Sequence, residues 1–301
     1  VEAQAKINEA GILVEQNVVQ PSHWWLSVPQ AIAVTYGNAY SRSRVEMALC
    51  GFTFGATDGN NLGTVSGSGE PLPLNEIAEG VLFGTGNGIP PTGGINVIYD
   101  DAVNGPILDR RGASVSSNLI DESFDGALCL RNLFTGRDHL AGDKLRGRDR
   151  KAHRKLLKSI REIRAKGDLG GRPAIFVTGR ADAIIPPNHA SRAYYGLNQL
   201  VEGDESNLRY YEITNAQHLD ALNALSGFDS RFVPLHHYFI QGLDLMFAHL
   251  KGELAELPPS QVVETVPRGD GAPQIEIDNV PPISDMPAKP ITFSGSALHI
   301  P

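Results

Sequence analysis

The chain has 301 residues, of which 41% are hydrophobic and 20% charged, and its formal net charge at pH 7 is −8. This composition predicts a globular protein with enough apolar residues for one large core. The acidic balance argues against attraction to nucleic acid or anionic lipid, and no apolar run approaches the roughly 18 residues of a membrane span, so neither partner is expected.

The chain begins at Val1, without an initiator methionine or a signal peptide. Such a start is expected of a processed chain or of the later part of a longer protein. Its two cysteines, Cys50 and Cys129, are too few for a disulfide framework and too far apart for a CxxC motif. They predict either one disulfide or two buried free thiols.

Residues 1–142 lack the alternation of strands and helices that a parallel sheet requires. Gly-rich loops separate helical stretches, which we expect at 3–13, 29–43, 74–83 and 124–136. A mostly helical, loop-rich segment of this kind is typical of a cap or lid, and we predict that role for residues 1–142.

Residues 144–166 hold 11 of the 26 Lys and Arg residues. Ala152, Leu156, Ile160 and Ile163 recur at helical spacing within this stretch, so a helix is predicted over 150–166 with its basic face in solvent. Aromatic or Gly-rich companions, which a polyanion site would need, are missing nearby.

The sequence from 143 to 257 has the pattern of an α/β domain. Short apolar runs predict strands at 171–179 and 208–214. Helices are expected at 188–201, with Asn188 as its N-cap, and at 233–252. Two parallel strands cannot stand alone, so further strands of this sheet must lie elsewhere.

The last 44 residues, 258–301, hold 9 of the 20 prolines and show no periodicity. They predict an extended tail that wraps the surface or is partly disordered.

An acid and a base follow the two predicted strands. Asp182 comes after the first and His218 after the second, and in open α/β sheets reactive groups collect at the carboxyl ends of strands. A carboxylate followed by a histidine, each on a loop after a strand, is the order of the acid and base in α/β-hydrolases. In such a pair the carboxylate orients the imidazole, and the imidazole takes the proton of a nucleophile.

The nucleophile of such a triad is missing from the sequence. The motif G-x-S-x-G does not occur, and the stretches around Ser66, Ser68 and Ser114 do not follow a predicted strand. We therefore expect the catalytic serine, and both donors of the oxyanion hole, upstream of Val1. No metal site is assigned, because a His-x-x-x-His pair is absent and His236 and His237 are about 100° apart on one helix; a cofactor is not expected either.

Several long segments resemble D-(-)-3-hydroxybutyrate oligomer hydrolases, over nearly the whole chain and in one order. They include PSHWWLSVPQAIAVTYGNAYSR, LCGFTFGATD, SFDGALCLR, GRPAIFVTGRADAIIPPNHASRAYYGLN, YYEITNAQHLDALNALSGFDSRFVPLHHYFIQGLDLMFAHL and LPPSQVVETVPRG. The resemblance implies a secreted or periplasmic serine esterase of α/β-hydrolase type, with a cytoplasmic location as the alternative. It also implies that Asp182 and His218 are the acid and base, and that the serine lies in an N-terminal half outside this chain.

The sequence therefore predicts the C-terminal part of an α/β-hydrolase: a cap over 1–142, the acid- and base-bearing core over 143–257, and a Pro-rich tail over 258–301. The predicted reaction is hydrolysis of 3-hydroxybutyrate dimers and short oligomers through an acyl-enzyme, without a cofactor. Two alternatives remain: an esterase of tannase or feruloyl type, and a hydrolase-fold binding protein that lacks catalysis.

Overall fold

A computed structural model describes residues 2–25, 28–43, 49–56, 95–99, 124–225, 227–266, 269 and 271–301. The chain divides into two compact units. We call residues 1–21 with 165–301 the sheet unit, and residues 22–164 the disulfide unit. Each unit is described by itself.

The disulfide unit contains helices and a small antiparallel sheet. Its helices are α3 (Val28–Ser41), α5 (Phe124–Thr135) and α6 (Gly147–Glu162), and its strands are β1 (Phe52–Ala56) and β2 (Ile95–Tyr99). α2 (Gln20–Trp25) contains the boundary between the units. Leu130 and Leu133 of α5 and Leu156 of α6 are buried, and the two helices pack against each other.

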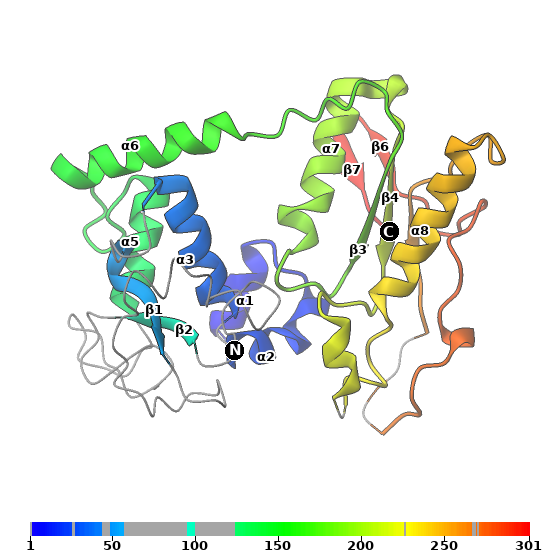
Figure 1. Ribbon diagram of the computed structural model, residues 1–301, viewed down its shortest axis with the longest axis horizontal. Helices are drawn as coiled ribbons and strands as arrows, with labels where there is room; N and C mark the ends of the chain where they lie inside the picture. Colours follow the sequence, from blue (N-terminus) through cyan, green and yellow to red (C-terminus); the bar gives the residue numbers. More distant parts are fainter. Residues whose placement is uncertain are drawn as a thin grey trace. The chain divides into compact units, whose positions relative to one another are not determined.

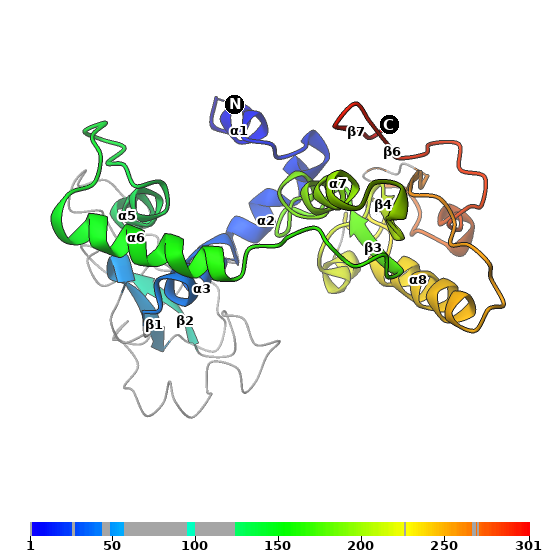
Figure 2. The ribbon, with the colours of Figure 1, turned by 90° about the horizontal axis from the view of Figure 1, so that it is seen from above.

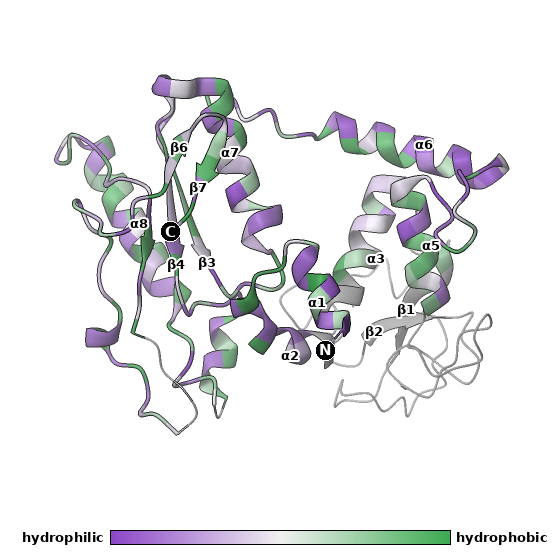
Figure 3. Ribbon diagram, turned by 180° about the vertical axis from the view of Figure 1, so that it is seen from behind, coloured by the Kyte–Doolittle hydropathy of each residue, from purple (hydrophilic) through white to green (hydrophobic). Residues whose placement is uncertain are grey.

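The helices predicted for this region are confirmed where the structure describes them. α6 covers most of the predicted 150–166 segment, and hydrophilic residues dominate its length in Figure 3. The antiparallel pairing of β1 with β2 is an addition that the sequence analysis does not predict. The helix expected at 74–83 lies outside the described residues.

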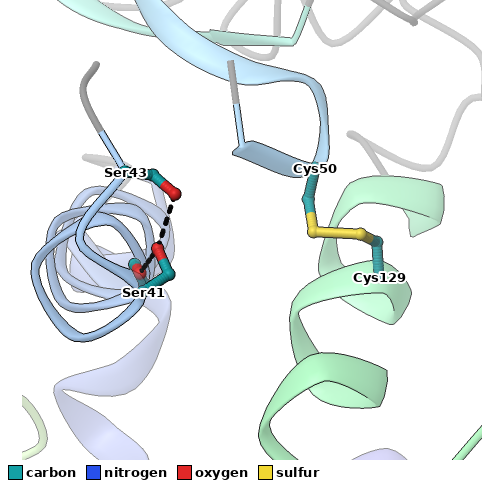
Figure 4. Close-up of a disulfide and its surroundings, with 5 residues drawn as sticks. Ser41, Ser43, Cys50 and Cys129 are labelled. Carbon is teal, nitrogen blue, oxygen red and sulfur yellow. Dashed lines mark hydrogen bonds between the residues drawn. A yellow bond between two sulfur atoms is a disulfide. The ribbon is translucent and has the colours of Figure 1, made fainter. Parts of the chain in front are cut away.

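A disulfide joins Cys50 to Cys129 across 79 residues of sequence. Cys50 lies in the 3-10 turn η3 (Leu49–Gly51) just before β1, and Cys129 lies in α5 (Figure 4). Of the two alternatives open from the sequence, the structure has the single disulfide.

Removing this disulfide is expected to destabilise the protein by about 2–4 kcal/mol, because closing a long loop reduces the entropy of the unfolded chain. The measurement is thermal unfolding of the Cys50→Ser/Cys129→Ser variant. Dithiothreitol should lower the Tm of the unsubstituted protein and leave that of the variant unchanged. Equal Tm values for both proteins without reductant would contradict the prediction.

The sheet unit is built on three parallel strands in the order β3–β4–β5. β3 (Ala174–Gly179) and β4 (Leu208–Ile213) are the two predicted strands, and they pair in parallel register from Ala174↔Leu208 onward. β5 (Gln261–Val263) pairs with β4 from the other side. Figures 1 and 2 show α7 (Ser191–Glu202) on one face of this sheet and α8 (Leu235–Leu250) on the other.

Alternating side chains of β4 face the two helices. Tyr210 lies in an apolar cluster with Tyr195 of α7, whereas Tyr211 lies in a second cluster with Tyr238 of α8. All but one of the six residues of β4 are buried, which is typical of a central strand covered on both faces. The mixed α/β content that the sequence predicts is thereby confirmed. The more specific α/β-hydrolase fold stays a prediction.

Three details differ from the expectations. β5 lies within the predicted tail, where the sequence predicts no strand, because three residues are too short to show a period. The tail also forms the hairpin of β6 (Thr292–Ser294) and β7 (Ala297–His299). Asn188 is not the N-cap of α7, because Pro187–His189 form a separate 3-10 turn before Ser191.

Residues at the N-terminal end of the chain belong to the sheet unit. α1 (Glu2–Glu9) is followed by the 3-10 helix η1 (Val14–Val18), and Val19 is buried with Ala181 and Phe232. The predicted division at 142/143 and 257/258 does not coincide with the two units, and the cap, core and tail roles stay predictions. None of the described helices combines the length and apolar content needed to cross a bilayer.

Candidate active site

Asp182 and His218 lie together at the carboxyl edge of the sheet. Nδ1 of His218 is 2.8 Å from Oδ2 of Asp182, although the residues are 36 positions apart in sequence. The Asp182 side chain is 6% exposed and that of His218 is 32% exposed. A buried carboxylate thus meets a partly exposed imidazole.

Backbone hydrogen bonds join the two loops that carry these residues. The amide of Arg180 donates to the carbonyl of Ile213 (2.8 Å), and that of Ala181 donates to the carbonyl of Ala216 (2.9 Å). Beyond β4 the chain turns at Asn215, whose φ of 54° is one that asparagine tolerates better than most residues. The loops therefore continue the parallel pairing of β3 with β4 past the strand ends.

The carboxylate of Asp182 is held in place by its own loop. Oδ1 accepts hydrogen bonds from the amides of Ile184 (2.9 Å) and Ile185 (2.8 Å), which leaves Oδ2 for the imidazole. The side-chain amide of Gln16, which is fully buried, donates to the backbone carbonyl of Asp182.

Asp220 connects the loop that carries His218 to the start of α8. Its Oδ1 accepts from the amide of Leu235 (2.9 Å) and its Oδ2 from the amide of His236 (2.8 Å), both in the first turn of α8. The carboxylate therefore satisfies two amides that have no partner within the helix. His218 is held between β4 and the start of α8.

Hydrogen bonding to Asp182 raises the pKa of His218 above its ordinary value of 6.5. Burial acts in the opposite direction, and the negative charge of Asp182 adds to the rise. An imidazole oriented in this way can take a proton at Nε2 and return it, as a general base and then a general acid.

The raised pKa predicts a pH dependence with a definite sign. The protonated His218–Asp182 pair stabilises the folded protein fully below pH 6.5, and this contribution is lost as pH rises through the higher folded-state pKa. NMR titration of the His218 Cε1–H signal should give a midpoint above 6.5, and a lower one in Asp182→Asn. A midpoint at or below 6.5 in the unsubstituted protein would contradict the assignment.

A cleft of about 400 Å³ opens beside the imidazole. It is lined by Val177, His218, Asp220, Leu235, His236 and Phe239. Among the described residues, no hydroxyl group is hydrogen-bonded to Nε2 of His218. Ser66, Ser68 and Ser114 lie outside the described residues. Within the described ranges, no three His, Cys, Asp or Glu side chains gather in a way that could hold a metal ion.

Gly179 permits the close approach of the two loops. A Cβ atom at this position would lie 2.4 Å from the carbonyl oxygen of Ala216, the same oxygen that accepts the amide of Ala181. The roles of Gln16 and Asp220 leave no signal in the sequence, because their hydrogen-bond partners are distant along the chain.

Gly179→Ala is expected to destabilise the protein by about 1–3 kcal/mol, because the backbone must move to relieve the overlap. Chemical denaturation measures this loss. Gly196→Ala is the matched control: it lies in α7 with no atom within 4 Å of the added Cβ, and helix propensity should make it neutral or stabilising. Equal stability of the two variants would contradict the role of Gly179.

Comparisons with known proteins give one consistent family. The family model described as 3HB-oligomer hydrolase matches residues 1–301. The chain is 42% identical over 304 residues to the D-(-)-3-hydroxybutyrate oligomer hydrolase of Burkholderia ambifaria, covering 100% of this chain and 39% of that protein. The protein of the same name from Polaromonas sp. (strain JS666) is 43% identical, with 99% and 40% covered.

The chain thus spans about two fifths of the length of these curated relatives. No solved structure matches it.

Proposed function

This chain belongs to the 3HB-oligomer hydrolase family, and on that premise we propose that it supplies the acid and base of a serine-type carboxylic ester hydrolase. The observation that carries the proposal is the hydrogen bond between Nδ1 of His218 and Oδ2 of Asp182. The nucleophilic serine is assigned to the N-terminal portion of the full-length protein, which is the partner of this chain in the site.

The proposed reaction passes through an acyl-enzyme. Nε2 of His218 takes the serine proton as the serine oxygen attacks the ester carbonyl, and Asp182 stabilises the resulting imidazolium. The imidazolium then protonates the departing alkoxide. In the second half, His218 takes a proton from water, water attacks the acyl carbon, and the serine recovers its proton.

The proposed substrates are 3-hydroxybutyrate dimers and short oligomers, as the names of the relatives suggest. Hydrolysis of a dimer yields two molecules of 3-hydroxybutyrate. We assign the cap role to residues 1–142, the completion of the core to 143–257 and a wrapping role to 258–301.

The test uses the full-length gene product, purified and supplied with the 3-hydroxybutyrate dimer. Release of monomer, with an organophosphonate probe bound to a serine outside residues 1–301, supports the proposal. Faster turnover of aryl esters than of the dimer would favour an esterase of tannase or feruloyl type. Absence of both hydrolysis and probe labelling would favour a binding protein and overturn the proposal.

We also propose that the protein works outside the cytoplasm, in the periplasm or secreted. The Cys50–Cys129 disulfide supports this location, because such bonds persist mainly in oxidising compartments. Thiol alkylation of cell fractions provides the test: protein with reduced Cys50 and Cys129, found only in the cytoplasmic fraction, would overturn it.

A further inference from the structure

One edge of the three-stranded sheet has no partner among the described residues. β4 is central and β5 covers its far side, so β3 is an edge strand. The amides of Ala174 and Arg180 donate toward the β4 side. Because the direction of backbone hydrogen bonding alternates along a strand, the amides and carbonyls of Ile175 and Val177 point to the open edge.

An apolar groove of about 670 Å³ follows this open edge. β3 contributes Ile175 and Val177 to its lining, and α8 contributes Phe239, Leu243 and Met246. These α8 residues recur at helical spacing and form one face. Phe239 and Leu243 are each 49% exposed, which is unusual for large apolar side chains next to a buried sheet.

The groove has the chemistry expected of a site that binds one more strand. A docked strand would pair with the edge-facing amides and carbonyls of β3, which have no partner among the described residues, and would cover the apolar faces of α7 and α8 beside it. α8 already lies close to β3, since a Cβ at Gly242 would be 3.3 Å from Val177. A small ligand would leave the unpaired backbone of β3 unsatisfied.

The groove also continues toward the candidate active site. Val177 and Phe239 line both the groove and the cleft beside His218. A strand parallel to β3 would end at the same edge of the sheet as Asp182 and His218, where a nucleophile would have to be delivered.

We propose that the open edge of β3, with the facing sides of α7 and α8, binds a β-strand from the part of the full-length protein outside residues 1–301. The relatives supply such a part, because the chain spans only about two fifths of their length. The inference rests on the proposed function for the identity of this partner as the remainder of the hydrolase core.

Hydrogen exchange on the full-length protein tests the pairing directly. Amides of Ile175 and Val177 should be protected to within about tenfold of the Phe176 amide, because all three would open only with the sheet. Mass spectrometry with electron-transfer fragmentation gives the required resolution. Fast exchange at Ile175 and Val177 beside slow exchange at Phe176 would overturn the proposal.

A photo-crosslinker identifies the occupant. Benzoylphenylalanine in place of Leu243 should crosslink to a peptide outside residues 1–301, whereas the same group in place of the exposed Asp244 on the same helix should not. Crosslinks to a second copy, or only within residues 1–301, would overturn the proposal. Ester hydrolysis by the same preparations separates the two inferences: crosslinking without hydrolysis refutes the function alone, and hydrolysis without crosslinking refutes the docking alone.

Discussion

Asp182→Asn in the full-length protein is expected to lower kcat for ester hydrolysis by about 10⁴-fold. The asparagine oxygen can still accept from the amides of Ile184 and Ile185, so the loop should keep its form. Its NH₂ group would then face Nδ1 of His218, which favours the tautomer with the proton on Nε2. That tautomer cannot accept a proton from a serine.

His218→Ala is expected to lower kcat further, by about 10⁶-fold, because it removes the proposed base. The double variant should be no slower than His218→Ala alone, since the carboxylate acts only through the imidazole. Steady-state and single-turnover kinetics on the 3-hydroxybutyrate dimer measure both effects.

Asp244→Asn provides the matched control for these variants. Asp244 is exposed on α8, so this change should leave kcat and Tm unaltered. The assignment fails if Asp182→Asn retains near-normal kcat, or if its loss of activity is matched by a loss of folded protein in circular dichroism.

Glu212→Gln is expected to destabilise the protein by about 3–5 kcal/mol, because it removes a buried charge that is paired with two arginines. Glu212 is fully buried in β4. Arg192 donates to it through Nε (2.8 Å) and Nη2 (2.6 Å), and the hydroxyl of Tyr210 donates at 2.6 Å. Arg180 forms a further ion pair with it.

The lowered pKa of Glu212 also reflects how the two arginines stabilise its charged form. Burial alone would raise it, but the hydrogen bond from Arg192 and the charges of Arg180 and Arg192 lower it below 4.5. The depressed pKa stabilises the folded protein above pH 4.5, and this contribution is lost as pH falls through the folded-state value.

Urea unfolding at neutral pH measures the loss, with Glu253→Gln, an exposed glutamate, as control. In a double-mutant cycle, Glu212→Gln and Arg192→Gln together should cost less than the sum of the two single changes. Additive effects, or a Glu212→Gln loss no larger than that of Glu253→Gln, would refute the importance of this cluster.

Local sequence patterns were sufficient for the elements that carry the site. The apolar runs before Gly179 and at 208–214 predict β3 and β4, and the order of Asp182 and His218 after them predicts that the two side chains meet. This prediction was correct because neighbouring parallel strands end at the same edge of a sheet, and that does not depend on the rest of the chain.

Tertiary contacts decided the features that the sequence left open or concealed. The pairing of Cys50 with Cys129, the place of Gln261–Val263 beside β4, and the hydrogen bond from Gln16 to Asp182 each join residues far apart in the chain. Such pairings depend on how the elements pack against one another. A short segment has no periodic sequence pattern that would reveal its packing partner. The sequence by itself predicted that Asp182 and His218 meet; only the tertiary structure decided what holds these two side chains in place and which edge of the sheet lacks a partner among the described residues.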